Sequence, residues 1–235
     1  MNSYTRRGVH GQVVREIASR VLSGAYPEGA TIDVSTLEDE LGVSRTVVRE
    51  ALKVLTAKGL VDARQKRGTY VLQRARWNLL DADVLAWQFA GRSDESFLDQ
   101  LHEMRAIVEP AGAGLAAGRR TPADLAAIDA AVEQMVRAEG DPDAAVAADL
   151  AFHRALLAAT HNELLTRMEM LLETGLASRD RLVHTTSPHD DPVPSHRAVA
   201  DAIRDGDAER AAAAMSQLLD KALADLRRAR EGNPP

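Results

Sequence analysis

The sequence predicts a mainly α-helical protein with two domains, an N-terminal winged helix-turn-helix and a C-terminal all-α antiparallel helix bundle. Only 3% of the 235 residues are aromatic while 45% are hydrophobic, which favours helices packed on small aliphatic side chains over a β-sandwich. Two adjacent helices with a tight turn and a hairpin fit the first third of the chain, and helical periodicity dominates the rest. We expect the winged domain over residues 1–76, a linker over residues 77–94 and the bundle over residues 95–229.

The charge of the chain is divided unevenly between these two parts. Residues 1–76 contain 13 Lys and Arg against 8 Asp and Glu, whereas the whole chain contains 29 against 35. A basic first part suggests that it meets a polyanion, although short segments also fluctuate by a few charges. The absence of cysteine excludes disulfides, thiolate metal sites and a cysteine nucleophile. With no apolar run of membrane length and no signal-like start, we expect a cytoplasmic protein without a membrane partner.

The first domain begins with an amphipathic helix that ends at Gly24. Ser35, with a glutamate three residues later, is a capping-box pattern for a second, short helix, which Gly42 terminates. Ser44 can cap the third helix, which ends at Gly59. The segment LVDARQKRGTYVL then predicts two strands around a basic turn, the wing. The apolar stripe expected to bury the first helix consists of Val13, Val14, Ile17, Val21 and Leu22.

The residue types at the start of the third helix and at the wing tip suit contact with DNA. A helix N-terminus offers N–H groups and the positive end of the helix dipole to phosphates, while arginine reaches guanine edges in the major groove. Basic side chains on a wing suit phosphate or minor-groove contact. The alternative is a solvated, charged helix face. The candidate DNA-binding residues are Ser44, Arg45, Thr46, Arg49, Lys66, Arg67 and Gly68.

The stretch VSRTVVREALKVLTAKGLVDARQKRGTYV closely resembles the DNA-binding domain of the GntR superfamily of bacterial transcription regulators. The resemblance implies a DNA-binding regulator with a winged helix-turn-helix. Many relatives carry Pro-Ser-Glu-Arg before the first helix of the motif and contact DNA through its arginine. This chain reads IDVST there, with Ser35 at the place of the arginine, so that contact is not carried over.

Beyond residue 95 the pattern is almost entirely helical. One long helix is expected over LHEMRAIVEPAGAGLAAGR, where Pro110 marks a kink or a break, and another over TPADLAAIDAAVEQMVRA, with Thr121 as its cap. The later helices are DPDAAVAADLAFHRALLAAT, NELLTRMEMLLETGLASRDRLV, SHRAVADAIRDG and DAERAAAAMSQLLDKALADLRRARE, with TTSPHDDPVP as a loop. Trp77 and Trp87, in the connector WNLLDADVLAW, are expected to anchor the linker onto the bundle.

The segment DLAFH places an acid and an imidazole four residues apart within one predicted helix. Residues at this spacing lie one turn apart on the same side, so Asp149 and His153 can share one ion. The alternative is a buried, hydrogen-bonded pair without a metal.

The whole body resembles the FCD effector domain of the FadR subgroup of GntR regulators, through MRAIVEPAGAGLAA, DLAFHRALLAATHN and HRAVADAIRDGDAERAAAAM. WNLLDADVLAW and ATHNELL are similar to regulators of sugar-acid use. The resemblance implies Asp149, His153 and His196 as metal ligands, with Leu218 at the fourth ligand position. Such ligands suit a divalent metal, Zn²⁺ first. Either three ligands hold the metal and leave positions for water or an effector carboxylate, or the site holds no ion and the imidazoles bind the effector.

The same resemblance places Arg105 at the effector cavity, where a guanidinium suits a carboxylate. The alternative is an interhelical salt bridge, with Glu109 as a candidate partner. The role of His161 stays open. We expect His102, His184 and His189 at the surface or in loops. The candidate effector-binding residues are Arg105, Asp149, His153 and His196.

Together these observations predict a ligand-responsive transcription regulator that is not an enzyme. It is expected to bind a palindromic operator in double-stranded DNA as a homodimer, because one winged helix buries too little DNA for tight specific binding. A small carboxylate such as an aldonate is expected to release it, as repression relieved by effector is usual in this family. Lactate, a dicarboxylate or an acyl ligand are alternative effectors. A metal-dependent enzyme is the alternative of another class, disfavoured because HExxH, G-x-S-x-G and phosphate-loop motifs are missing from the sequence.

Overall fold

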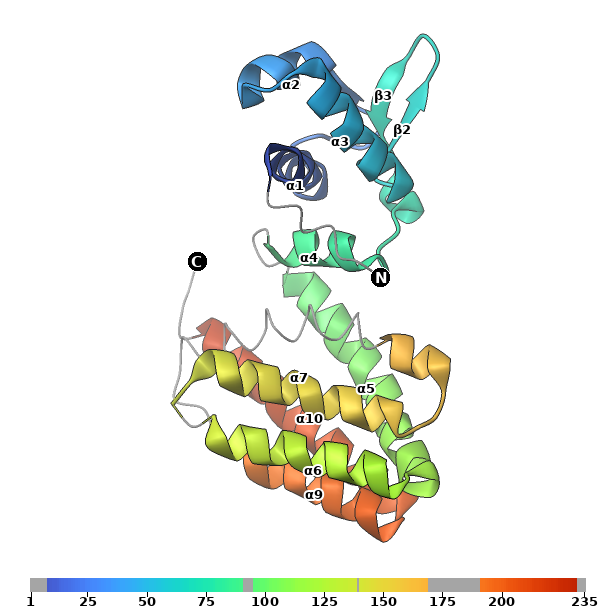
Figure 1. The fold of residues 1–235 in the computed structure, drawn as a ribbon, viewed down its shortest axis with the longest axis vertical. Helices are drawn as coiled ribbons and strands as arrows, with labels where there is room; N and C mark the ends of the chain where they lie inside the picture. Colours follow the sequence, from blue (N-terminus) through green and yellow to red (C-terminus); the bar gives the residue numbers. More distant parts are fainter. Residues whose placement is uncertain (1–7, 91–94, 139, 169–190, 232–235) are drawn as a thin grey trace. The chain divides into compact units, whose positions relative to one another are not determined.

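The computed structural model describes residues 8–90, 95–138, 140–168 and 191–231, which form two compact units, Met1–Asp94 and Glu95–Pro235. The first unit is a small three-stranded sheet with helices, and the described residues of the second form helices joined by short connections (Figure 1). The predicted fold class, a winged helix-turn-helix followed by a helix bundle, is therefore confirmed. In the described parts of the chain, no helix is both long and apolar enough to cross a membrane.

The first unit builds its sheet from three short antiparallel strands in the order β1-β3-β2. Strands β2 and β3 form the predicted wing, with Arg64 opposite Gly68 at its end. The stripe predicted for the first helix is buried except for the half-exposed Leu22. The elements are α1 (Val9–Leu22), β1 (Thr31–Ile32), α2 (Val34–Leu41), α3 (Arg45–Ala57), β2 (Val61–Arg64), β3 (Gly68–Val71), η1 (Arg74–Arg76) and α4 (Ala82–Ala90).

The start of α2 differs from the expectation, because Asp33 and not Ser35 is its N-cap. The Asp33 carboxylate accepts hydrogen bonds from the backbone N–H groups of Ser35 and Thr36, at 2.7 and 3.2 Å. Ser35 already lies inside the helix, and its hydroxyl donates to the same carboxylate. Ser44 does occupy the N-cap position of α3, but its side chain makes no capping hydrogen bond. Gly42 ends α2 as expected, at a φ of 62° that favours glycine.

The expectation that both tryptophans anchor the linker onto the bundle is wrong, since they pack on the first unit. Trp87, on α4, is 7% exposed and belongs to the same buried cluster as the cores of α1 and α3. Trp77 packs against that cluster, and its indole N–H donates to the carbonyl of Leu72 at 2.9 Å. Lys58, at the end of α3, forms ion pairs of 2.7 Å with both Asp81 and Asp83 before and within α4. Helix α4 therefore fastens to the end of α3 by charge and to the core by apolar contact.

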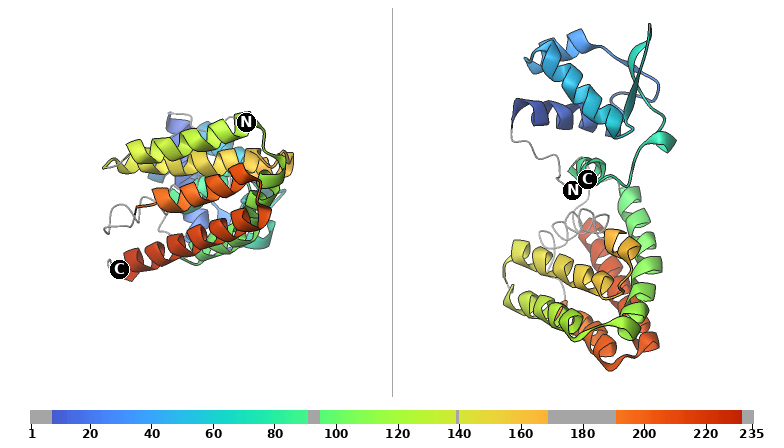
Figure 2. Two further views of the ribbon diagram at one scale, coloured as in Figure 1. Left: turned by 90° about the horizontal axis from the view of Figure 1, so that it is seen from below. Right: turned by 45° about the vertical axis from the view of Figure 1, so that its right-hand side comes forward.

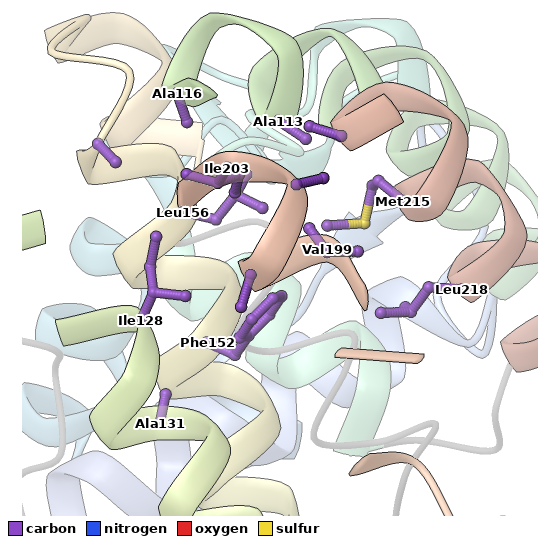
Figure 3. Close-up of a cluster of buried hydrophobic side chains, with 14 of the residues drawn as sticks. Ala113, Ala116, Ile128, Ala131, Phe152, Leu156, Val199, Ile203, Met215 and Leu218 are labelled. Atoms are coloured by element: carbon purple, nitrogen blue, oxygen red, sulfur yellow. The ribbon is translucent and has the colours of Figure 1, made fainter. Parts of the chain in front are cut away.

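Among the described residues of the second unit, five long helices pack around one hydrophobic core (Figures 1 and 2). Helices α6 and α7 lie side by side, α9 packs on α6 and α10, and α5 contacts α7, α9 and α10. Phe152, Leu156, Ile203 and Met215 are fully buried at its centre (Figure 3). The long helices are α5 (Glu95–Arg119), α6 (Pro122–Arg137), α7 (Pro142–Ala158), α9 (Val193–Asp205) and α10 (Ala208–Glu231).

Two local features of this unit bear on the predictions. Pro110 lies inside α5, which continues through it, so it does not mark a break. Gly112 brings α5 close to α7, because a Cβ atom there would lie 3.2 Å from the Leu157 Cδ2 atom. Residues 163–168 are helical, as predicted, while the rest of that expected helix, most of the loop TTSPHDDPVP, His184 and His189 fall outside the described residues.

Candidate functional site

Asp149, His153 and His196 come together in the second unit, as the family resemblance implied. Asp149 and His153 lie one turn apart on α7, and His196 is in the first turns of α9. One ligand atom from each residue lies within 4.8 Å of the other two. Both imidazoles are buried, with exposures of 2% and 3%, beside the half-buried carboxylate. The three side chains form a compact oxygen and nitrogen cluster, of the kind that can hold a divalent metal ion.

The His196 imidazole is oriented by the start of its own helix. Its Nδ1 atom lies 2.8 Å from the carbonyl oxygen of Pro192, which can only accept, so Nδ1 carries the proton. The Nε2 atom then carries the lone pair of the ring. It lies 3.0 Å from Asp149 Oδ1 and makes no hydrogen bond to the described residues. Two acceptor atoms at this distance repel each other unless a cation or a proton lies between them. The ligand geometry therefore fits a cation.

Arg105 and Glu109 extend this cluster onto α5. Arg105 Nε donates to Glu109 Oε1 at 2.5 Å, and the two side chains are 3% and 0% exposed. Glu109 was the suggested partner for Arg105, but the ion pair lies within one helix and not between helices. Burial by itself would raise the pKa of Glu109, but the charge of Arg105, together with the interaction with His153, outweighs it and lowers that pKa to about 2. Glu109 is therefore ionised at neutral pH.

His153 makes contacts on both sides of its ring with this ion pair. Its Nε2 atom accepts a hydrogen bond from Arg105 Nη2 at 3.2 Å, because a guanidinium can only donate. Its Nδ1 atom, which then carries the proton, lies 2.8 Å from Glu109 Oε2 at an angle that is poor for a hydrogen bond. Sequence reasoning named Glu109 only as a candidate partner for Arg105 and missed its contact with His153. The available signal was an acid on the apolar face of a predicted helix, four residues after an arginine.

The fourth family position holds an aliphatic side chain in the structure too. Leu218, on α10, is 5% exposed and packs in the hydrophobic core near Met215 (Figure 3). It contributes methyl groups and no ligand atom. The chain thus offers three candidate ligands from this set, which would leave coordination positions of a bound cation for other groups.

Two hollows lie near parts of this site. A crevice of about 10 Å³ between α5 and α10 is lined by Arg105 and by His102, which is half-buried and not at the surface as expected. A larger hollow of about 460 Å³ lies between the end of α6 and the starts of α7 and α9. Pro192, which orients His196, lines the larger hollow, but none of the three ligand residues does.

His161 has a structural part that the sequence left open. It takes a left-handed backbone conformation with φ 50°, directly after α7. Its Nε2 atom lies 2.9 Å from the carboxylate of Asp124, in the first turn of α6. That carboxylate also accepts from the backbone N–H of Thr121 in a capping box, and this bond, more than the contact with His161, lowers the pKa of Asp124. His161 therefore ties the end of α7 to the start of α6.

In the first unit, the candidate DNA-binding residues lie at two exposed places. Ser44, Arg45, Thr46 and Arg49 are exposed at the N-terminal end of α3, where the first N–H groups of the helix face outward. Arg45 comes within 4.0 Å of Glu38 on α2. The second place is the tip of the wing.

The wing tip distinguishes its three candidates. Lys66 is exposed and takes φ 67°, and Gly68 takes φ 81°, so the turn bends through two left-handed residues. Arg67 folds back: its guanidinium lies 4.0 Å from the centre of the Tyr70 ring and donates to the carbonyl of Gly29 at 3.0 Å. Arg67 thus stabilises the wing, while Lys66 projects its charge into solvent.

Comparison with known proteins matches both units. A family model for bacterial regulatory proteins of the gntR family matches residues 10–71, and a model for the FCD domain matches residues 100–221. The galactonate operon transcriptional repressor of Escherichia coli (strain K12) is 33% identical over 211 residues, covering 86% of this chain and 90% of that protein. A regulatory protein named for the L-lactate dehydrogenase operon of Escherichia coli (strain K12) is 34% identical over 183 residues, covering 75% of this chain and 69% of that protein.

Similarity to solved structures supports the fold. The structure of Lar, described as controlling expression of the Listeria monocytogenes agr system, aligns with a TM-score of 0.64 at 18% identity. The alignment covers 97% of this chain and 99% of that one. At this level of identity, the likeness concerns the architecture alone.

Proposed function

Since the chain belongs to the GntR family of bacterial regulatory proteins and carries an FCD domain, we propose that it is a repressor released from its operator by a small carboxylate. The family and the relatives described above are DNA-binding transcription regulators and not enzymes. The proposal adds the sign of regulation, the class of effector and the residues that bind it.

The observation that carries the effector assignment is a buried cationic and imidazole cluster in the helical unit. Arg105, at 2% exposure, is a planar donor suited to a carboxylate, and it adjoins the three residues that fit a cation. Asp149, His153 and His196 would hold a divalent metal, with Zn²⁺ the first choice for two imidazoles and one carboxylate. A bound divalent cation would supply Lewis-acidic positions for carboxylate oxygens.

An aldonate or related sugar acid is the effector that the relatives favour. The likeness to a galactonate operon repressor, over 86% of this chain, supports a sugar acid. The likeness to a protein named for the L-lactate dehydrogenase operon supports lactate as the second candidate. Both are 2-hydroxy carboxylates, which offer a carboxylate for Arg105 and a neighbouring hydroxyl for a cation.

DNA binding is proposed to use a homodimer on a palindromic operator. Each protomer would place the start of α3 in the major groove through Ser44, Arg45, Thr46 and Arg49, while Lys66 meets the backbone beside it. Effector binding would favour one arrangement of the two winged units over another, which linkage requires for any change in operator affinity.

The experiment combines metal analysis of the purified protein with a binding screen. Elemental mass spectrometry measures metal per chain, and thermal shift measures binding of galactonate, gluconate and lactate with and without a chelator. We expect about one divalent ion per chain and a carboxylate shift that the chelator abolishes. Absence of any carboxylate shift would contradict the effector class.

Two variants separate the two activities of the regulator. Arg49→Ala is expected to abolish operator binding in fluorescence anisotropy while the thermal shift with carboxylate persists. His153→Ala is expected to bind operator normally but no longer be released by the carboxylate. Normal operator binding by Arg49→Ala would contradict the α3 assignment, and normal release of His153→Ala would leave the cluster as packing.

A further inference from the structure

Glu109 is a buried carboxylate that touches both kinds of binding group in the site. Its Oε1 atom accepts from Arg105 Nε at 2.5 Å, and its Oε2 atom lies 2.8 Å from His153 Nδ1 and 3.3 Å from Arg105 Nη2. Its exposure is 0%. A buried ion pair adds little stability compared with well-packed apolar residues, so the structure raises the question of what this carboxylate does.

We propose that Glu109 is a positioning residue that couples the effector arginine to the metal-binding histidine. It holds Arg105 by its Nε atom, and it selects the His153 tautomer in which Nε2, 3.7 Å from Asp149 Oδ2, carries the lone pair. This inference rests on the proposed function and names how two parts of that site depend on each other.

The tautomer of His153 follows from the chemistry of its two neighbours. Arg105 offers only donors to Nε2, and the Glu109 carboxylate offers only acceptors to Nδ1. Both neighbours therefore favour a proton on Nδ1 and a lone pair on Nε2. His196 has the same arrangement, with the Pro192 carbonyl as its acceptor, so both imidazoles present Nε2 to Asp149. Acceptors of this kind commonly fix metal-binding imidazoles.

The lone pair of His153 Nε2 can serve only one partner at a time. In the structure, that partner is Arg105 Nη2, at 3.2 Å. A cation bound to Nε2 would take the lone pair and leave Arg105 Nη2 free to donate to an effector carboxylate. Glu109 would keep the guanidinium in place through Nε during this exchange, and its negative charge would offset the repulsion between Arg105 and the cation.

The test must separate positioning of His153 from neutralisation of Arg105. Glu109→Gln keeps the shape but leaves a buried guanidinium without its partner, which can prevent folding. Arg105→Met/Glu109→Gln and Arg105→Met/Glu109→Met avoid this, because neither leaves a buried charge unpaired and they differ in whether an acceptor oxygen faces His153 Nδ1. Glu103→Gln, on the exposed side of α5, is the matched control for loss of a negative charge.

Two measurements on the full chain decide the question. Zinc affinity is measured by competition with a chromogenic chelator, and the His153 tautomer is read from the ¹⁵N chemical shifts of its ring. We expect Arg105→Met/Glu109→Met to bind zinc about 10- to 100-fold more weakly than Arg105→Met/Glu109→Gln, as for other residues that orient a metal ligand. In the Glu109→Met form, the His153 proton is expected to move from Nδ1 towards Nε2. Glu103→Gln is expected to match the wild type in both readouts.

Equal zinc affinity and the same His153 tautomer in the two double variants would overturn the inference and make Glu109 only a counter-ion. A wild-type chain that takes up no zinc would instead contradict the metal assignment in the proposed function. In that case the ¹⁵N shifts alone decide the inference, which fails if Arg105→Met/Glu109→Met keeps the proton on Nδ1.

Discussion

Lys66 offers a direct test of the wing, because its backbone and its side chain make opposite predictions. The residue takes φ 67°, a left-handed conformation that costs a side-chain-bearing residue about 1–2 kcal/mol. Its side chain is exposed at the wing tip, where it is proposed to meet a phosphate. We therefore expect Lys66→Gly to stabilise the first unit and to weaken operator binding.

The magnitudes follow from the two effects taken separately. Glycine removes the left-handed strain but adds about 0.5–1 kcal/mol of unfolded-state entropy, which leaves a net gain of about 0–1.5 kcal/mol in unfolding free energy. Each lost phosphate contact reduces the magnitude of the slope of log affinity against log salt by about 0.9. For the proposed homodimer, with two wings, the magnitude of the slope should fall by about 2. Lys66→Ala is expected to show the same change in slope without the gain in stability.

Both quantities can be measured in the full-length chain. Both tryptophans of the sequence pack in the first unit, so intrinsic fluorescence during urea unfolding reports that unit. Operator affinity is measured by anisotropy over a series of salt concentrations. Gln65→Gly is the matched control, since its φ is not positive, and it should lose about 0.5–1 kcal/mol with an unchanged salt slope. A less stable Lys66→Gly protein would refute the strain, and an unchanged slope would refute the phosphate contact.

Three further predictions concern other parts of the chain. Leu218→His, which restores the imidazole of the family position, is expected to tighten zinc binding at least about tenfold, or about 1.4 kcal/mol, in chelator competition; unchanged affinity would show that position 218 does not reach the cluster. Trp87→Ala, at a side chain that is 7% exposed, is expected to cost the first unit about 3–5 kcal/mol in urea unfolding followed by Trp77 fluorescence, with the bundle unaffected. The pKa of Asp124 in the folded chain lies below the ordinary value of 3.8. The ionised carboxylate therefore stabilises the fold above pH 3.8, and this stabilisation is lost as the pH falls through the pKa of the folded state. Asp124→Asn should therefore lower bundle stability at pH 7, by up to about 1 kcal/mol in circular dichroism melts, and the difference from wild type should shrink below pH 3.8; a difference that persists in acid would contradict this.

The parts of the fold that could be predicted from the sequence are those set by local chemistry. Gly42 ends α2 in a left-handed conformation, as a glycine between two short helices predicts. The choice between Asp33 and Ser35 as N-cap could not be made locally, since both are good caps two residues apart. The structure settles it through the conformation of the chain leaving β1, which sets Asp33 in extended backbone and Ser35 in the helix.

The packing of apolar side chains across elements was less predictable. Trp87 lies in a short apolar segment that fits either neighbouring unit by composition. Its attachment to the first unit depends on Lys58, whose ammonium pairs with two aspartates flanking the start of α4 and lies 5.6 Å from the centre of the Trp87 ring. This arrangement brings together residues about 30 positions apart in the sequence. The periodicity within a single helix gives no information on such contacts between elements.

The candidate site shows the same division between local and tertiary information. The spacing of Asp149 and His153 on one helix predicts a shared side, but His196 was assigned to the site only by family resemblance. Glu109 reaches the site because α5 packs against α7, where Gly112 permits a close approach. Burying charged groups in a helical core is costly unless they are paired. In this cluster, two hydrogen-bond acceptors, His196 Nε2 and Asp149 Oδ1, face each other at 3.0 Å. A cation would relieve that repulsion, and with Leu218 in place of a fourth ligand it would keep positions open for an effector carboxylate beside Arg105.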